Sequence, residues 1–124
     1  MLAQGREVAH DVLGKAAAKL AIALLDTDRV AEAKSLLLSE ITRSEKNIGD
    51  THETTLVLRM VYADTLRCDN PSLSDYVEAE TIIEDVEAKS RRVSGSDHPF
   101  TRGAKARLEK VRLEVSRRRA AGQA

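Results

Sequence analysis

The chain has 124 residues, which is enough for one domain with a modest core. Its 20 basic and 20 acidic residues cancel, and zero net charge argues against a protein dedicated to nucleic acid or to a membrane surface. Cys68 is the single cysteine, so an intramolecular disulfide is excluded, and the charged amino terminus lacks the apolar run of a secretory signal. We therefore expect a cytoplasmic protein.

The first expected element is a helix over residues 6–25. Apolar residues recur at every fourth position, a spacing that places them along one helical face. They are Val12, Ala16, Leu20 and Leu24. We expect this face to enter the core. The longest apolar run, Leu20 to Leu25, is far too short to span a bilayer, so no membrane partner is expected.

Four more helices follow in the pattern of apolar residues, over residues 30–48, 54–66, 73–93 and from 100 onward. The expected core positions are Val30, Ala33, Leu37, Ile41 and Ile48 in the second helix; Tyr76, Ala79, Ile83, Val86 and Val93 in the fourth; and Phe100, Ala104, Leu108, Val111 and Val115 in the fifth. The third helix is apolar nearly all round, as expected of a central helix. No period-two run is bounded by hairpin turns, so the predicted class is all-α with five helices.

The segments between the second and third helices and between the fourth and fifth helices carry the same kinds of turn and capping residues. Gly49 and Gly95 stand where a left-handed residue ends a helix. Thr51 and Asp97 are the expected N-caps of the next helices. A proline follows in the first turn of the fifth helix, where its missing N–H costs little.

An internal repeat links these features. Histidines at positions 10, 52 and 98 are separated by 42 and 46 residues, and the fragments VAEA and YVEA recur in register, ending at Ala33 and Ala79. The four extra residues fall in CDNPSLSD, residues 68–75, which predicts a lengthened loop. Two of the histidines, His52 and His98, directly follow the expected caps, so we interpret the histidine as a marker of the start of a repeat that packs or hydrogen-bonds within the turn.

The linkers IGDTHETT and SGSDHPFT resemble the L-G-x-D-H-P-x-T linker of tetratricopeptide repeats (TPR) of the kinesin-light-chain type. The pairs Leu20-Ala21 and Tyr62-Ala63 match the family's mid-helix positions. The resemblance implies a right-handed α-α superhelix, a TPR solenoid of about two and a half repeats in a single domain over 1–124: repeat 1 at 6–48, repeat 2 at 51–93 and a capping half-repeat at 97–120. Asp28 departs from the family, because it stands at the turn glycine.

The resemblance also implies a function, which is to bind a segment of a partner protein or peptide in a concave groove lined by the first helix of each repeat. The family's peptide-clamping asparagines are replaced here by Lys19, Val61 and Arg107. The groove positions implied by the resemblance are Lys15, Ile22, Leu25, Asp26, Val57, Met60, Asp64 and Arg67. We expect an apolar anchor pocket among them, with the charged positions setting the preference at its rim.

Catalysis, metals and cofactors are not expected. No nucleophile elbow, phosphate loop or dinucleotide fingerprint occurs in the sequence. Cys68 ends the third helix while the histidines begin helices, a separation of about 20 Å at 1.5 Å per residue. Histidines in successive hairpins would lie roughly 10 Å apart, given ordinary helix packing distances. That spacing is too wide for one zinc ion with ligands at about 2 Å.

Two other functions stay open. From Pro99 onward there are eight Lys or Arg and two Glu, whereas Asp69 to Lys89 carries seven acids and one base. We expect these two segments to attract each other within the fold. The basic segment could also stack end to end on an acidic surface in a self-associating structural fragment, or bind RNA through its tail, residues 116–120, although no aromatic stacking platform accompanies it.

Overall fold

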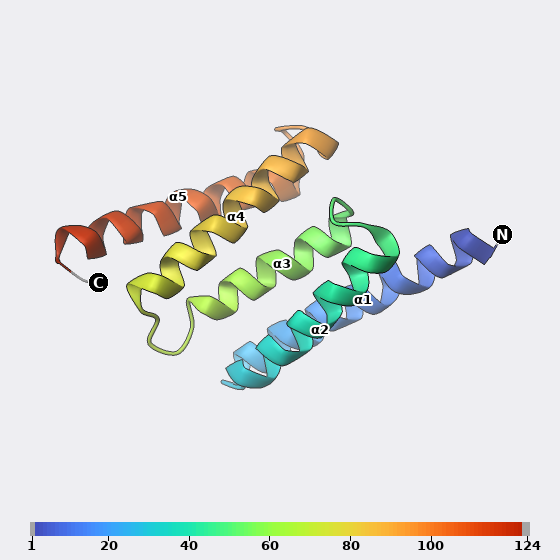
Figure 1. The fold of residues 1–124 in the computed structure, drawn as a ribbon, viewed down its shortest axis with the longest axis horizontal. Coiled ribbons are helices and arrows are strands. Elements are labelled where there is room, and N and C mark those ends of the chain that lie inside the picture. The colour runs from blue at the N-terminus through green and yellow to red at the C-terminus, as the bar shows by residue number, and fades with distance from the viewer. Residues whose placement is uncertain (1, 123–124) are drawn as a thin grey trace. The chain divides into compact units, whose positions relative to one another are not determined.

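The computed structural model describes residues 2–122 and contains five α-helices and no strand in that range (Figure 1). This confirms the predicted all-α class. The helices are α1 (Leu2–Asp26), α2 (Val30–Ile48), α3 (Glu53–Leu66), α4 (Leu73–Ser94) and α5 (Pro99–Ala120). The chain divides into two compact units, Met1–Thr65 and Leu66–Ala124, so α1, α2 and nearly all of α3 belong to the first unit and α4 and α5 to the second.

In the first unit, α1 and α2 lie side by side as an antiparallel hairpin, and α3 packs on the same core (Figure 1). The core combines small residues of α1 with larger ones of the other two helices. Its buried members are Ala17, Ala18, Ala21, Ala33, Leu37, Leu58 and Val61. Burying this apolar surface is the main force that holds the three helices together.

The buried face of α1 differs from the predicted one, of which only Leu24 packs against the core, half-buried. Val12 is 58% exposed and Leu20 is 52% exposed, and Ala16 is exposed as well. The residues that enter the core are Gly14, Ala17, Ala18 and Ala21. The reason is steric, because a Cβ atom on Gly14 would lie 2.5 Å from Cγ2 of Thr54, so the neighbouring helix approaches too closely for large side chains. The helix also begins at Leu2, earlier than position 6.

The turn between α1 and α2 is closed by backbone hydrogen bonds from Asp28 and Arg29 to the carbonyls of Leu25 and Leu24. Asp28 adopts a φ of 63° in the left-handed region. It stands where the resemblance to tetratricopeptide repeats implies glycine, and aspartate is among the few other residues that tolerate this conformation.

In the second unit, α4 and α5 form another hairpin, whose core is close to the predicted one. Its buried members are Leu73, Ala79, Ile83, Val86, Ala104, Leu108, Val111 and Val115. Val93 was expected in this core but is exposed. The predicted loop is confirmed between Leu66 and Leu73, and a capping box between Ser72 and Asp75 starts α4.

The two glycine turns have nearly the same backbone geometry. Gly49 has φ 92° and ψ 158°, and Gly95 has φ 91° and ψ 163°. These angles lie in a region open essentially to glycine alone, outside the left-handed helical region that the sequence suggested. Both residues are nevertheless C-caps, as predicted, so glycine is required at each turn for a backbone reason.

The histidines themselves cap the helices, and the prediction of Thr51 and Asp97 as N-caps is wrong. The Nδ1 atom of His98, the N-cap residue of α5, accepts a hydrogen bond of 3.1 Å from the backbone N–H of Phe100. His52 directly precedes α3 and accepts from the N–H of Thr54, also at 3.1 Å. An imidazole nitrogen thus satisfies one of the free N–H groups at each helix start, which a serine or aspartate commonly does.

Each turn is also tied across its two helices by buried hydroxyl groups. Ser44 of α2 and Thr55 of α3 are hydrogen-bonded at 2.5 Å, and Ser90 of α4 and Thr101 of α5 are hydrogen-bonded at 2.6 Å. Both pairs span the same number of residues and are buried. The two turns therefore share the histidine cap and the buried hydroxyl pair.

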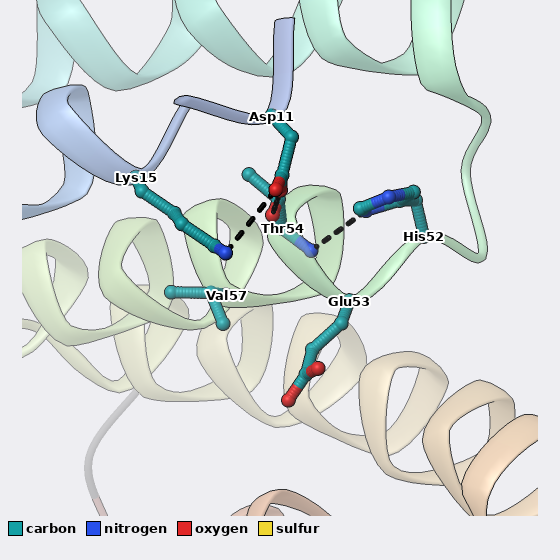
Figure 2. Close-up of a pocket in the computed structure, with 6 residues that line it drawn as sticks. All are labelled: Asp11, Lys15, His52, Glu53, Thr54 and Val57. Atoms are coloured by element: carbon teal, nitrogen blue, oxygen red, sulfur yellow. Dashed lines mark hydrogen bonds and ion pairs between the residues drawn. The ribbon is translucent and has the colours of Figure 1, made fainter. Parts of the chain in front are cut away.

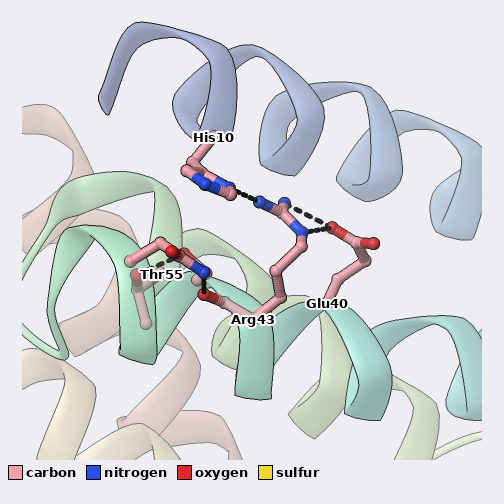
Figure 3. Close-up of polar contacts among 6 residues, drawn as sticks. His10, Glu40, Arg43 and Thr55 are labelled. Carbon is pink, nitrogen blue, oxygen red and sulfur yellow. Dashed lines mark hydrogen bonds and ion pairs between the residues drawn. The ribbon is translucent and has the colours of Figure 1, made fainter. Parts of the chain in front are cut away.

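His10 does not belong to this pattern. It lies inside α1, where its Nδ1 accepts a hydrogen bond from Arg43 of α2 (Figure 3). The same guanidinium donates through Nε to Glu40 at 2.9 Å. This half-buried contact joins the two helices of the first hairpin. The first histidine is thus in register in sequence but has a different structural role.

The expected attraction between α4 and α5 is seen in ion pairs. Arg112 of α5 lies 2.7 Å from Glu84 and 3.8 Å from Glu80 of α4. These pairs are partly exposed and are each worth at most about 1 kcal/mol. None of the helices within residues 2–122 is long and apolar enough to cross a membrane.

Arg118 makes the more extensive contacts of α5 with its own unit. Its guanidinium lies 4.5 Å from the centre of the Tyr76 ring, pairs with Glu114 at 3.0 Å and donates to the carbonyl of Pro71 at 3.0 Å. The end of α5 is thereby fastened to the loop that precedes α4 and to the first turn of that helix.

Candidate functional site

A pocket of about 450 Å³ lies between α1 and the start of α3, inside the first unit (Figure 2). Its lining combines two acidic side chains, a lysine, a histidine, a threonine and one apolar side chain. They are Asp11, Lys15, His52, Glu53, Thr54 and Val57. The first two come from α1 and the others from the turn before α3 and its first turns.

The pocket owes its shape to the close approach of α1 and α3. Gly14 lets the side chain of Thr54 rest directly on the α1 backbone. The Thr54 hydroxyl then donates a hydrogen bond to Asp11, and Lys15, one turn further along α1, pairs with the same carboxylate at 3.1 Å (Figure 2). Asp11 and Lys15 share a face because residues four apart on a helix are neighbours.

Asp11 carries a negative charge in this arrangement. The hydrogen bond from Thr54 holds the pKa of Asp11 below its ordinary value, the charge of Lys15 acts in the same direction, and partial burial opposes them. His52 uses Nδ1 as an acceptor from the backbone of Thr54, so the proton of a neutral imidazole resides on Nε2. The pocket therefore holds an ordered carboxylate together with donors from Lys15 and His52.

This set of groups offers a ligand hydrogen-bond donors, hydrogen-bond acceptors and one apolar wall. Lys15 and the His52 ring can donate to carbonyl or carboxylate oxygens, Asp11 and Glu53 can accept from N–H groups or cations, and Val57 supplies an apolar wall. The Thr54 hydroxyl contacts a carboxylate whose lowered pKa makes it a weak base. The hydrogen bond between Thr54 and Asp11 instead holds the Asp11 carboxylate, and the Lys15 side chain paired with it, in fixed positions.

The structure brings together two of the eight predicted groove residues, Lys15 and Val57, in this pocket. Ile22 and Asp26 are exposed further along α1, and Leu25 is half-buried against the core of the first unit. These three residues do not line the pocket.

The other predicted groove residues lie on or just beyond the later part of α3. Met60 is only 2% exposed, so it contributes to packing and offers almost no surface to a partner. Asp64 is half-buried, and Arg67 is half-buried and belongs to the second unit.

Sequence reasoning did not select Asp11, His52, Glu53 or Thr54 as site residues. One signal was available, because Asp11 and Glu53 occupy equivalent positions next to histidines separated by 42 residues. A second signal was Gly14, which has no side chain in the middle of an apolar helix and so marks a close helix contact.

A second pocket, of about 290 Å³, lies between α4 and α5. Its walls carry the ion pairs of Arg91 with Glu87 and of Arg112 with Glu84, and Ala88 and Leu108 also line it. Among the residues that the structure describes, no group of three or more His, Cys, Asp or Glu is placed to hold a metal ion.

No model of a known protein family matches the chain, and no curated protein sequence or solved structure matches it either. Function is therefore inferred from the side chains of the α1–α3 pocket.

Proposed function

We propose that the chain is a non-catalytic protein-interaction module of the tetratricopeptide type, which binds a segment of a partner protein along the face formed by α1 and α3. One observation carries the proposal, namely that a pocket opens between the first helices of the two expected repeats. Lys15 and Val57, which the resemblance implies as groove residues, both line it. The repeated turns support the same reading of the chain as a repeat protein.

The chemistry of the pocket suggests a ligand segment with an apolar side chain next to polar backbone. Val57 would contact the apolar side chain, while Lys15 and His52 would donate to carbonyl or carboxylate oxygens and Glu53 would accept from N–H groups. Such a site would select ligand segments by charge, because a ligand charge of the same sign as the nearby rim residue is left unpaired on binding.

The test is a selection of peptides from a displayed random library on the wild-type chain. Selected peptides are then measured against Lys15→Glu and against Lys15→Glu/Val57→Glu. The matched control is Lys46→Glu/Leu38→Glu, which makes the same changes at exposed positions of α2 outside the pocket. We expect the control to bind like wild type and the pocket variants to bind about tenfold or more weakly.

Equal binding by all variants, or no enriched peptide, would contradict the proposal. Because Val57 is half-buried, the double variant could lose its fold, and circular dichroism checks for this. The single change at Lys15, whose side chain is 66% exposed, keeps the test decisive in that case.

The alternatives of end-to-end assembly and RNA binding both need the basic charge of α5. Part of that charge is engaged inside the second unit, because Arg112 pairs with α4 and Arg118 with Tyr76, Glu114 and the Pro71 carbonyl. The described contacts therefore favour peptide binding at the α1–α3 pocket.

A further inference from the structure

A continuous apolar stripe runs along the side of α1 that faces away from its core. We call it the front face of α1 and define it as Val8, Val12, Leu13, Ala16 and Leu20. Five of the eight large apolar side chains that stand out as exposed in the described chain are on α1, and four of those five belong to this face. Scattered exposed apolar residues are normal, but a contiguous stripe on one helix marks an interaction surface.

The internal repeat shows what normally covers this face. The positions of α3 that correspond to Leu13 and Ala16 are Thr55 and Leu58, and both are fully buried. Thr55 is hydrogen-bonded to Ser44 of α2, and Leu58 belongs to the core formed with α1 and α2. In α3, therefore, the preceding hairpin α1–α2 covers the equivalent positions, and α2 is hydrogen-bonded to one of them, Thr55.

The corresponding positions of α5 give the same result. Thr101, Ala104 and Leu108 are buried, and Thr101 is hydrogen-bonded to Ser90 of the preceding helix, α4. In both later copies the part of the front face that corresponds to Leu13 and Ala16 is therefore an interface with a helix. On α1 the same face is exposed in the structure of residues 2–122.

The chain also shows what a helix face looks like when it meets water. The positions of α5 that correspond to the buried face of α1 are exposed, and most are charged or small. They are Arg102, Lys105, Ala106, Glu109, Arg112 and Leu113. Its single large apolar member is Leu113, whereas the front face of α1 has four. The front face of α1 thus has the composition of a covered surface.

We propose that the front face of α1 docks an amphipathic helix from a partner protein, with acidic residues beside its apolar stripe. Arg6 and Lys19 are both exposed and border the front face on its two sides, as the helical period of 3.6 residues requires. Glu7 and Asp11 fall on the other side of α1, and Asp11 is bound to Thr54. The rim of the surface is therefore basic and complements acids on the incoming helix.

The same rim disfavours a second copy of this chain as the occupant. An antiparallel pair of α1 helices packed through the front face would bring like flanks together, so the flank that carries Lys19 in one copy would run beside the same flank of the other. Leu13 stands where α3 and α5 have threonine, so the incoming helix presents an apolar side chain there in place of the serine used by α2 and α4.

The test uses two labelled helical peptides of about 20 residues, long enough to form a helix on binding. Both carry leucine at alternating third and fourth positions, and they differ only in having Glu or Lys on the flanks. Binding to the full chain is measured by fluorescence anisotropy. The front-face variant is Val12→Glu/Leu20→Glu, and the matched control is Leu38→Glu/Leu113→Glu, which changes two exposed residues elsewhere.

We expect the Glu-flanked peptide to bind wild type and control alike and to bind the front-face variant about tenfold or more weakly. The Lys-flanked peptide is expected to bind the wild-type chain about tenfold or more weakly than the Glu-flanked peptide does. Equal binding to all chains, no binding of the Glu-flanked peptide, or no preference between the peptides would overturn the proposal.

Sedimentation velocity of the wild-type chain alone tests whether a second copy of the chain binds this surface. A dimer that the front-face variant abolishes would show that a second copy takes this surface, and it would overturn the assignment to a partner helix. The result is independent of the peptide-binding pocket, because none of the front-face residues lines that pocket. Either proposal can therefore fail without the other.

Discussion

At the scale of single residues, Gly14 sets the spacing of α1 and α3. It lies beneath Thr54, whose side chain cannot easily turn aside because it is branched at Cβ and its hydroxyl is bonded to Asp11. The pocket thus depends on a residue that contributes no side chain to it. Gly5, on the same helix, has nothing within 4 Å of the position its Cβ would take.

The pair of glycines gives a matched prediction. Gly14→Ala is expected to lower the free energy of unfolding by about 1–3 kcal/mol, because overpacking forces α1 and Thr54 apart. Gly5→Ala is expected to leave it unchanged or raise it by up to about 1 kcal/mol, because alanine favours the helix. Urea unfolding followed by circular dichroism measures both. Equal stabilities of the two variants would show that the close contact is not formed.

Asp11 predicts a dependence on pH. Its pKa is lowered in the folded chain, so its charged form contributes stability that is fully present above the ordinary aspartate value of about 3.9 and is lost as the pH falls through the lower folded value. Wild type should therefore be more stable than Asp11→Asn at neutral pH, and the difference should shrink below a pH of about 3.9. Urea unfolding at several pH values tests this.

Asp26→Asn serves as the control for that series, because Asp26 is exposed at the end of α1 and lies outside the pocket. A gap between wild type and Asp11→Asn that stays constant from neutral to acidic pH would contradict the assigned role of the Thr54 hydrogen bond.

At the scale of helices, specific polar contacts hold several helix ends, and α5 shows this most fully. Arg117 and Arg118 both pair with Glu114, but only Arg118 also reaches Tyr76 and the loop carbonyl of Pro71. The side chain of Arg117 is 72% exposed, whereas that of Arg118 is 24% exposed. Neighbouring arginines of one tail therefore have different roles.

Alanine substitutions should separate these roles. Arg118→Ala is expected to lower the free energy of unfolding by about 1–2 kcal/mol, because it removes a ring contact and a hydrogen bond that are partly shielded from water. Arg117→Ala is expected to change it by less than about 0.5 kcal/mol, as for an exposed ion pair. Thermal unfolding measures both, and limited proteolysis of the 67–72 loop should quicken only in Arg118→Ala. Equal effects of the two changes would count against the fastening of α5.

The sequence predicted the helices better than the faces they bury. Spacing located all five elements to within a few residues, and the core of the second unit was largely identified. It failed for α1 because that helix is apolar on two sides, and periodicity alone does not say which side is covered. The packing of Gly14 against Thr54 decides it, and this contact joins residues distant in sequence.

Only two residues of the candidate site, Lys15 and Val57, were predicted from the sequence. They are positions implied by the resemblance to tetratricopeptide repeats, and both line the pocket. Thr54 and Asp11 enter through a hydrogen bond between two helices, and the capping role of His52 and His98 depends on the backbone path at Gly49 and Gly95. Threonine and aspartate are commoner caps, so the general preference favoured the wrong residues.

At the scale of the whole molecule, the described chain combines one apolar unpartnered face at α1 with a charged one at α5. The two ends of the helix series are therefore chemically unlike each other.

The matching turns have a consequence for how such a chain can change in length. A tandem duplication of the gene segment encoding His52 to Asp97 would insert 46 residues and leave the local pattern of each junction intact. Ser90 of the first copy would stand at the same distance in sequence from Thr55 of the second as Ser44 does from Thr55 now. A histidine would again follow each junction. A duplication of this 46-residue segment would thus lengthen the chain by two helices whose caps are already encoded in the duplicated sequence.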